Sequence, residues 1–517
     1  MKIPPVSRPE PDFNDFLTTF KSRLQHLLHV RSDIDKLSIK RGIPPFILRD
    51  ILAAQPMACF IPRTYGGRGG HIHEGLALLA AASYESLPLS LGFGINWALF
   101  LQPVAKYAME PVKQPVFDGF LSGQKMGGLM ITEPDFGSDA LHMQSHYRQE
   151  GDHFHIQGVK HWAGLTGWAD YWLLTARRQH DSGQLGRDVD FFICDTSAAG
   201  QTVVVEELFE NLGIYMLPYG RNRIDVRVPT VQKLQPESTG IKMMLDLLHR
   251  SRMQFPGMAL GFLQRLEDEA VAHCRRRQVG GKSLFQYDQV QQRLSGLQAN
   301  VTVAAALCLN SSSKAGVERD LSGAGLEANA VKTCVTDLMQ ESAQSLLQLV
   351  GAKGYRLDHI AGRALVDSRP FQIFEGSNDI LYIQIAESVQ KLMQRRKERN
   401  LLAFSRQFEL TRRAVDSVHR QINVDLVLPL AQRQLNAFGQ LISRMIALHL
   451  VEELGDSGYS PVHIDICRTH LRQRIAAEVG GFLALSTSTY QDIEAADRDW
   501  LDCFYRQRQR DGFSPSA

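Results

Sequence analysis

The spacing of apolar residues along the chain changes twice. From residue 13 to about residue 125, apolar residues recur at helical spacing, as at Phe16 and Phe20, and prolines interrupt the pattern. Between residues 126 and 231 the pattern becomes short runs rich in β-branched and aromatic residues, separated by Gly and Asp turns. From residue 241 onward the helical period returns and persists. The sequence therefore predicts a helical unit, a β unit and a second helical unit, in that order.

The clearest runs predict individual elements. The expected strands are residues 153–157, 171–176, 191–194, 202–206 and 224–228, which would form a small barrel or sandwich. The expected long helices are residues 241–277, 287–310, 327–350 and 377–395, which indicate a bundle, and helical spacing continues beyond residue 396.

These changes divide the chain into four expected domains, because 517 residues exceed the roughly 250–300 at which one core stops growing. They are a helical N-terminal domain (1–125), a middle β domain (126–235), a C-terminal helical bundle (236–395) and a helical C-terminal extension (396–517). The predicted fold class is α+β.

Charge and cysteine content narrow the function. Lys and Arg total 57 against 55 Asp and Glu, so the net charge of +2 gives no field for gripping a polyanion, and nucleic acid is not an expected partner. The seven cysteines fit neither a disulfide framework nor a metal site, which indicates a reducing, cytoplasmic setting. The first residues, MKIPPVSRPEPDF, lack the apolar stretch of a signal peptide, and the longest apolar window, around residues 76–82, is too short to span a bilayer. We expect a soluble protein, with peripheral membrane association as the alternative.

A polar loop, GLMITEPDFGSD, opens the β unit at residues 128–139. Its alternation of Gly with hydroxyl and carboxylate side chains suits a loop that wraps a flat polar ligand with hydrogen bonds. An Asx-rich turn is the structural alternative, and the chemistry of the loop by itself favours that turn. A second motif downstream changes the balance.

The T-E-P-x-x-G-S-D loop resembles a motif of the acyl-CoA dehydrogenases, and the G-x-K-x-W element at residues 158–162 resembles the one that follows it. In that family the Thr, here Thr132, binds FAD, and the residue matching Leu129 lies on the flavin ring. The Ser, here Ser138, contacts the CoA arm of the acyl thioester. The Trp, here Trp162, packs beside the isoalloxazine, for which an ordinary core aromatic is the alternative.

The second motif departs from the family pattern two residues after its Trp. The family usually has Thr or Ser there, whereas this chain has Gly164. Gly164 is thus expected beside the flavin without one of the usual hydrogen bonds. Thr166 is a substitute, shifted by two positions.

Two further segments resemble FAD contacts that the family makes across a subunit boundary. The QLVGAKGY segment resembles Q-x-x-G-G-x-G-[FY], which implies that Gln348 and Gly351 meet the adenine and pyrophosphate end, where Gly permits close backbone approach. A helix C-cap is the alternative. Arg277 matches an arginine that pairs with the FAD pyrophosphate, and the two arginines before it could share that role.

The catalytic segment, FQIFEGSNDI, resembles the Y-E-G-T-[NS] loop of the family. Glu375 matches the catalytic base, and Ser377 matches a hydroxyl that contacts FAD. A base that removes a weakly acidic α-proton must sit within about 3 Å of it, in a dry site that raises its pKa. Phe374 and Ile373 are expected to help dry the site. A solvent-facing Glu at a helix start is the alternative.

Three further residues are expected beside the substrate. Phe374 and Gly376 flank the base in the same loop. Arg252 matches an arginine that faces the acyl-CoA arm, but the acidic residue that often lies three positions before it is replaced by His249, which favours a different carrier end. Exposure of Arg252 and Arg250 as surface charges is the alternative.

The resemblance covers roughly residues 13–395 and implies an acyl-CoA-dehydrogenase-like fold with a four-helix C-terminal bundle. It also implies FAD-dependent dehydrogenation of a fatty acyl thioester: Glu375 removes the α-proton, FAD N5 accepts the β-hydride and a trans-2-enoyl thioester results. An electron-transfer flavoprotein is the expected acceptor. The alternatives are a dehydrogenase acting on acyl carrier protein thioesters, an oxygen-using oxidase and an inactive assembly or scaffold protein.

Residues 396–517 exceed the short form of the family and resemble the C-terminal extension of its long-chain members. In those members the extension accompanies dimers rather than tetramers, and sometimes membrane proximity. We therefore expect a homodimer, with a tetramer as the alternative.

Overall fold

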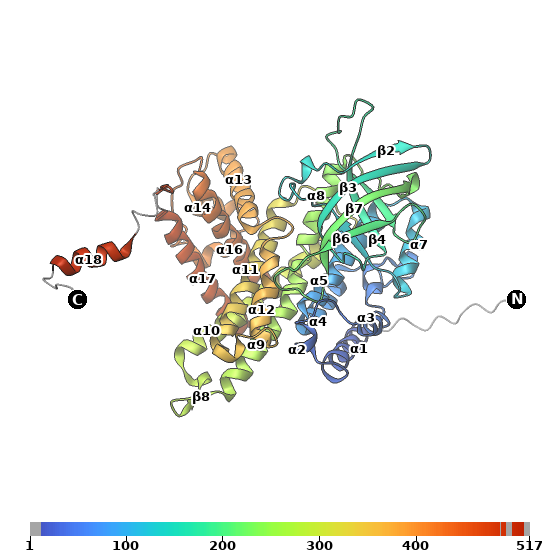
Figure 1. Cartoon of the computed structure of the whole chain (residues 1–517). Helices are drawn as coiled ribbons and strands as arrows, with labels where there is room; N and C mark the ends of the chain where they lie inside the picture. The colour runs from blue at the N-terminus through green and yellow to red at the C-terminus, as the bar shows by residue number, and fades with distance from the viewer. Residues whose placement is uncertain (1–11, 486–487, 493–498, 511–517) are drawn as a thin grey trace.

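The computed structural model describes residues 12–485, 488–492 and 499–510 (Figure 1). The N-terminal helices and the β-sheet pack together on one side of a helical bundle, and the C-terminal extension packs on its other side. Residues 1–11, which hold most of the segment without an apolar leader, lie outside the described residues. The order helical, β, helical, with extra C-terminal helices, confirms the predicted fold class.

The N-terminal region is helical, and one apolar stretch forms its centre. Its helices are α1 (Phe13–Gln25), α2 (Ile34–Leu37), α3 (Pro45–Leu52), α4 (Ile72–Glu85), α5 (Leu87–Asn96), α6 (Gln102–Tyr107) and α7 (Glu110–Leu121), with η4 (Trp97–Leu101) between α5 and α6. The stretch Leu87–Tyr107 could cross a membrane by length and composition, but 94% of its apolar window is buried inside the fold. The expectation that the longest apolar window lies at residues 76–82 is therefore wrong, and the longer stretch is a core helix.

The middle region is one seven-stranded sheet in the order β1-β4-β2-β3-β7-β6, with β5 paired to β4. The strands are β1 (Gly127–Met130), β2 (His146–Glu150), β3 (His153–Gly164), β4 (Tyr171–Arg178), β5 (Asp190–Asp195), β6 (Val203–Leu208) and β7 (Tyr219–Pro229). Five of them match the expected strands. The pattern missed β1 and β2, because β1 has four residues and β2 buries only Tyr147, so neither shows a period of two.

The C-terminal bundle consists of α8 (Gly240–Arg252), α9 (Phe255–Arg276), α10 (Asp288–Lys314), α11 (Gly325–Val350), α12 (Ile360–Ser368) and α13 (Asn378–Arg396). The expected helix at residues 241–277 is in fact two helices. Pro256 lies in the first turn of α9, where its missing N–H needs no partner, and it cannot continue a preceding helix. Because of this break, Ser251 and Arg252 end α8, and Gln254 lies in the joint just before α9.

The C-terminal extension packs directly on the bundle through α16 and α17, whereas α18 stands apart from it (Figure 1). It contains α14 (Leu401–Gln407), α15 (Val415–Val418), α16 (Gln432–Asp456), α17 (Pro461–Leu483) and α18 (Trp500–Arg510). α16 lies against α13, α10 and α11, and α17 lies against α16 and α10. α13 and α16 approach closely because a Cβ at Gly439 would overlap the carbonyl oxygen of Tyr382.

Gly439→Ala should test this close approach. The added methyl must displace the α13 backbone, so we expect a loss of about 1–3 kcal/mol in the free energy of unfolding, measured by urea denaturation. Gly480→Ala is the control, since a Cβ there has nothing within 4 Å. The control should gain about 0.5–1 kcal/mol from helix propensity. Equal effects of the two changes would contradict the packing described here.

Candidate active site

The predicted catalytic loop forms a left-handed turn between η9 (Arg369–Gln372) and α13. Glu375 has a φ of +54° and Gly376 a φ of +89°. A non-glycine residue in this conformation costs about 1–3 kcal/mol and persists only where its surroundings fix it. The surrounding structure must therefore supply contacts that hold the turn.

Two buried cations supply those contacts. Arg252 donates from Nε at 3.1 Å and from Nη2 at 2.9 Å to the carbonyl oxygen of Glu375. Lys332, in α11, donates from Nζ at 2.9 Å to the carbonyl oxygen of Gly376 and at 2.9 Å to Oδ1 of Asn378. Both side chains are buried, so these charge-assisted bonds act where water does not compete.

The Glu375 carboxylate is only half satisfied. Ser251 donates from Oγ to Oε1 at 2.7 Å, whereas Oε2 is buried and has no hydrogen-bond partner among the described residues. Burial raises the pKa of Glu375, and the Ser251 bond and the charges of Arg252 and Lys332 offset only part of the rise. Burial also lowers the pKa of Lys332 to about 7. A carboxylate in this state can accept a proton from a bound ligand.

The carboxylate faces a small cavity of about 10 Å³. The apolar part of its lining is Leu91, Ile95, Ala98, Leu99 and Met258. The prediction that Ile373 dries the site is wrong, because Ile373 is 56% exposed. Phe374 packs against Phe371, with ring centroids 5.0 Å apart. A larger cleft of about 570 Å³ between α10, α11 and α17 contains none of the predicted site residues.

The two motifs of the β region meet at a bulge in β3. The N–H of His161 donates to the carbonyl of Thr132 at 2.8 Å, and the register between β3 and β7 shifts between Lys160 and Ala163. Trp162, within the bulge, has a φ of +55° and is 54% exposed, with its ring centroid 4.6 Å from that of Phe209. The core-aromatic alternative is therefore wrong: the bulge presents a flat apolar ring at the surface.

A buried ion pair holds the loop that carries Thr132. Glu133 accepts hydrogen bonds from the N–H of Gln144 at 2.6 Å, the N–H of Ser145 at 3.0 Å and Nζ of Lys160 at 2.9 Å. Burial alone would raise the pKa of Glu133, but Lys160 and these donors lower it overall. Burial lowers the pKa of Lys160 to about 8. Glu133 of the first motif and Lys160 of the second thus fix the shape of the loop.

Gly164 connects the β region to the carboxylate. A Cβ there would lie 2.6 Å from Ile95 and 3.3 Å from the ring of Tyr219, and the charge of Glu375 helps to raise the pKa of Tyr219 beyond the effect of burial. Thr166 is not the substitute we expected, because its hydroxyl donates to the carbonyl of Ala163 and accepts from Asn222. Tyr219, which the sequence analysis did not single out, places a tyrosine ring and its hydroxyl group beside Gly164.

Several predicted residues present unused groups. Leu129, Thr132 and Ser377 are partly exposed, and Ser138 is exposed. The hydroxyls of Thr132, Ser138, Ser377 and Tyr219 make no hydrogen bond with any described residue. Free hydroxyls beside exposed apolar surface are what a ligand with a flat ring and a polar edge requires.

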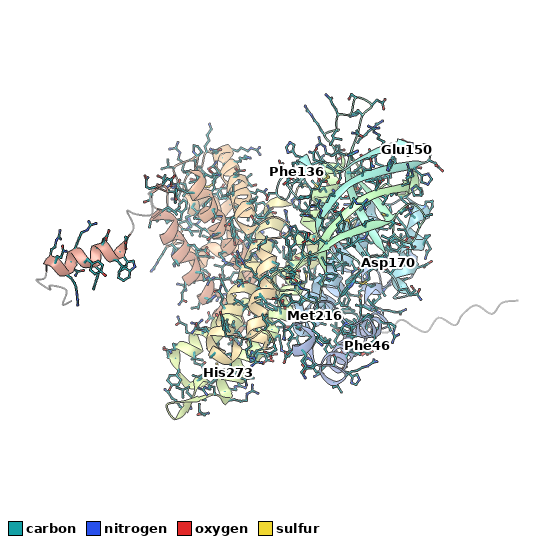
Figure 2. All side chains as sticks on the ribbon, in the orientation of Figure 1. Phe46, Phe136, Glu150, Asp170, Met216 and His273 are labelled. Carbon is teal, nitrogen blue, oxygen red and sulfur yellow. The ribbon has the colours of Figure 1, made fainter. Side chains whose placement is uncertain are left out.

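Arg277, Gln348 and Gly351 lie at another place in the chain. All three are exposed, and Gly351 has a φ of +71°. Burial and then the charges of Arg276 and Arg277 lower the pKa of His273, near Lys353 and His359, so cations gather at this end of the bundle. Figure 2 shows that His273 lies at the far end of the bundle from Phe136, which belongs to the polar loop at residues 128–139. One chain therefore does not bring these three residues to its own Trp162.

The surface-charge alternative for Arg250 and Arg252 is wrong. Arg250 is 2% exposed and binds Asp246 and the carbonyls of residues 315, 316 and 319. The inference from His249 also fails, since this residue is buried and its Nδ1 contacts the Leu321 carbonyl at 2.7 Å. Burial lowers its pKa to about 4. Arg252 holds the Glu375 turn, and its contact with the acyl-CoA arm stays a prediction.

Comparison with known proteins decides the family. The acyl-CoA dehydrogenase middle-domain model matches residues 128–226, and the C-terminal-domain model matches residues 238–390. The chain belongs to the acyl-CoA dehydrogenase family. A glutaryl-CoA dehydrogenase of Desulfococcus multivorans is 26% identical over 329 residues, which are 63% of this chain and 83% of that protein.

Two solved structures share the fold of this acyl-CoA dehydrogenase family member. An acyl-CoA dehydrogenase complexed with FAD from Bacillus anthracis matches with a TM-score of 0.71 and 15% identity. The match covers 100% of this chain and 94% of the Bacillus anthracis chain. A prolyl acyl carrier protein oxidase has a TM-score of 0.66 and 18% identity, and covers 74% of this chain and 100% of its own. At these identities the likeness concerns the fold alone. The first match includes the C-terminal extension.

The family makes the chain an FAD-dependent oxidoreductase, and the residues present fit that cofactor. The exposed Trp162 ring and Leu129 suit a flat isoalloxazine, and the unpartnered hydroxyls of Thr132 and Ser377 suit its polar edge. Bound FAD supplies an acceptor for a hydride.

Sequence reasoning missed Ser251, Lys332, Tyr219 and Gln254. Lys332 carried a signal, since it is the lone charge in the apolar run ANAVKTCV on a helix. The other three had none, because their roles depend on side chains that meet only in the folded chain.

Lys160→Met tests the support of the flavin loop. Leaving Glu133 buried without its cation should cost about 3–5 kcal/mol in unfolding free energy and should weaken FAD retention, measured by urea denaturation and gel filtration. Lys36→Met, which removes a side chain that is 78% exposed in its ion pair with Asp33, should change stability by less than about 1 kcal/mol. The double change Lys160→Met with Glu133→Gln should recover part of the loss. Full FAD retention by Lys160→Met would contradict this role.

Proposed function

We propose that this protein oxidises the Cα–Cβ bond of an acyl thioester and that Glu375 is the base that removes the α-proton. The observation that supports the proposal most is the carboxylate itself. Its Oε2 is buried without a partner among the described residues, its pKa is raised, and it opens onto a mostly apolar cavity. A base of this kind is poised to take a proton from carbon in a dry site.

The other residues of the turn act through the placement of that carboxylate. Arg252 and Lys332 bind the carbonyls of Glu375 and Gly376, so the turn cannot relax to an ordinary backbone conformation. Ser251 fixes one carboxylate oxygen and leaves the other for the proton. The backbone N–H of Glu375 is the expected donor to the thioester oxygen as negative charge develops there.

The carrier and the electron acceptor are separate parts of the proposal. We favour a CoA thioester and an electron-transfer flavoprotein, as the resemblance implies, and a cytoplasmic setting, as the cysteine content indicates. The fold is shared with a prolyl acyl carrier protein oxidase, so carrier-protein thioesters and oxygen are the runners-up. Comparing turnover of one acyl chain on CoA and on acyl carrier protein distinguishes the two carriers. Release of peroxide in air distinguishes oxygen from an electron-transfer flavoprotein as the acceptor.

A second copy of the chain would complete the flavin site. Arg277, Gln348 and Gly351 form an exposed cationic end that lies away from Trp162 in the same chain. A guanidinium and a glycine turn suit a pyrophosphate, which only another copy can bring to them. We therefore propose a homodimer, which light scattering can distinguish from a tetramer.

The acyl group of the substrate should carry a polar end. Gln254 lines the cavity and donates from Nε2 to Oε1 of Gln102 at 2.6 Å. Its own Oε1 and the Nε2 of Gln102 are buried without a hydrogen-bond partner among the described residues. Each such orphan costs about 1–3 kcal/mol, which a hydrogen-bonding group on the acyl chain would recover.

Glu375→Gln should lower the rate constant of anaerobic flavin reduction by an acyl-CoA about 10²–10⁴-fold. In the parent, the rate should rise with pH through the raised pKa of Glu375, because only the ionised carboxylate accepts the proton. The variant should lose this rise. Glu409→Gln, at an exposed position, is the matched control and should behave as the parent. Bleaching of the Glu375→Gln flavin at the parental rate would disprove the base assignment.

Gln254→Leu should change the preference between two isosteric thioesters, 4-hydroxybutyryl-CoA and pentanoyl-CoA. The parent should prefer the hydroxyl compound at least about tenfold in kcat/KM, since a buried amide left unpaired penalises the methyl analogue. The variant should reverse this order. Gln292→Leu, in α10, serves as a control that leaves it unchanged. A parental preference for pentanoyl-CoA would contradict the polar-end proposal while leaving the base assignment intact.

A further inference from the structure

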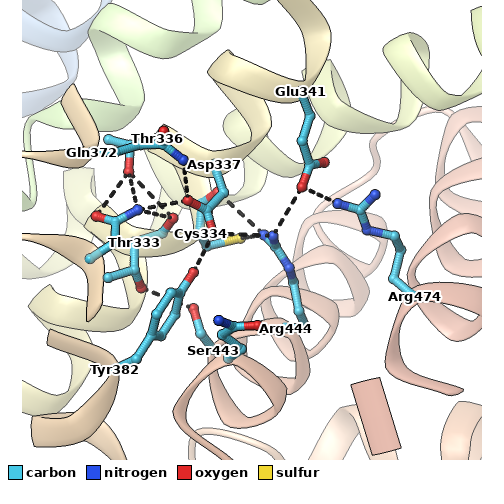
Figure 3. A network of polar contacts seen from close by, with 12 residues as sticks. Thr333, Cys334, Thr336, Asp337, Glu341, Gln372, Tyr382, Ser443, Arg444 and Arg474 are labelled. Carbon is cyan, nitrogen blue, oxygen red and sulfur yellow. Dashed lines mark hydrogen bonds and ion pairs between the residues drawn. The ribbon is translucent and has the colours of Figure 1, made fainter. Parts of the chain in front are cut away.

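We propose that the C-terminal extension is part of the catalytic apparatus and that Arg444, in α16, is a positioning residue for the turn that carries Glu375. The inference rests on the proposed function in one respect, the role of Glu375 as base. Its evidence is a continuous series of polar contacts from α16 to the carbonyl of Gly376. Figure 3 shows the part of this series around Arg444 and Asp337.

The extension contacts α13 where that helix begins, two residues after Gly376. Asn436 donates to Oδ1 of Asp379 at 3.1 Å, and Gly439 brings the α16 backbone against that of Tyr382. The first turn of α13 is therefore fixed from the side of the extension. Any shift of α16 is transmitted to the helix that follows the catalytic turn.

Arg444 is the buried cation of this contact. It is 4% exposed, and its Nη1 donates to the carbonyl oxygen of Cys334 at 3.3 Å. Its Nη2 lies 3.5 Å from Oδ2 of Asp337 and 3.6 Å from Oε1 of Glu341, and its Nε donates to Glu478 at 3.4 Å. One guanidinium thus faces three carboxylates, with Arg474 as a second cation on Glu341 (Figure 3). A buried charge so placed fixes the positions of its partners.

Asp337 passes this constraint to the start of α13. Its Oδ1 accepts from Nδ2 of Asn378 and from Nε2 of Gln372, each at 2.7 Å. Its Oδ2 accepts from the hydroxyl of Tyr382 at 2.5 Å. The carboxylate therefore ties together η9, which precedes the catalytic turn, and α13, which follows it (Figure 3). The turn lies between the two tied segments.

Asn378 completes the series. While its Nδ2 donates to Asp337, its Oδ1 accepts from Nζ of Lys332, which also donates to the carbonyl oxygen of Gly376. The contacts run from Arg444 through Asp337, Asn378 and Lys332 to the turn. Without Arg444, the negative charge of Asp337 would compete more strongly for Lys332 and draw it from the Gly376 carbonyl.

The decisive variant is Arg444→Met in the full-length, FAD-loaded protein. We expect flavin reduction by an acyl-CoA to slow at least about tenfold, while KM changes less than about twofold, because the turn loosens but the acyl cavity stays. We also expect deuterium uptake at the backbone amides of residues 372–381 to rise. Arg444→Lys keeps the charge and should recover most of the rate.

Arg468→Met is the matched control. Arg468 also lies in the extension and binds Glu452 through Nε and Nη2, each at 2.8 Å, but it is not part of the series that leads to Asp337. It should lower the melting temperature without changing the reduction rate or the exchange at residues 372–381. A purely structural Arg444 would behave in the same way. Parental rate and parental exchange in Arg444→Met would therefore overturn the proposal.

A folding failure does not remove the test. If Arg444→Met does not fold, the double variant Arg444→Met with Asp337→Asn removes one of the three carboxylate charges that would be left without Arg444, and its reduction rate should still be at least about tenfold below the parent. A parental rate in the double variant would overturn the proposal. Failure of the base assignment would appear separately, as unchanged reduction in Glu375→Gln, whereas deuterium exchange in the Arg444 variants reports on the turn whichever residue is the base.

Discussion

The left-handed turn at Glu375 and Gly376 is the constraint on which the rest of the site depends. Two consecutive carbonyl oxygens accept hydrogen bonds from two buried cations, Arg252 and Lys332. Because burying a cation is costly, these charges are stable only while the carbonyls stay where they are. The strained backbone and the buried charges thus hold each other in place. The consequence is a carboxylate whose direction the fold fixes before any ligand arrives.

The β region and helix α5 of the N-terminal region meet close to this carboxylate, at Gly164. Gly164 leaves the space that Ile95 and Tyr219 fill, and Ile95 also lines the cavity of Glu375. A residue with a side chain at position 164 would collide with Ile95 and would contact the ring of Tyr219 tightly. The absence of the usual Thr or Ser at this position is therefore coupled to the packing around the carboxylate.

Much of the architecture was predictable, since long periodic helices and alternating strands such as β7 carry their own signal. Short strands, the break before Pro256 and the burial of Leu87–Tyr107 were not, because neighbours in space decide them. Glu375 and Trp162 were identified by motif, and both proved to be non-glycine residues with positive φ. The motif could not show that Arg252 binds the turn, that Ile373 is exposed or that His249 is buried, since each depends on contacts between distant segments.

The contact between the extension and the bundle places charged groups in the interior, which costs desolvation free energy. Well-packed apolar residues in place of Arg444 and its carboxylates would often be as stable or more stable, because desolvation offsets much of the attraction between buried charges. Apolar packing alone, however, tolerates small sliding of one helix on another, whereas Asp337 fixes Asn378 and Tyr382 by direction as well as distance. A network of this kind fixes the register of α13, whose first turn directly follows the Glu375 turn.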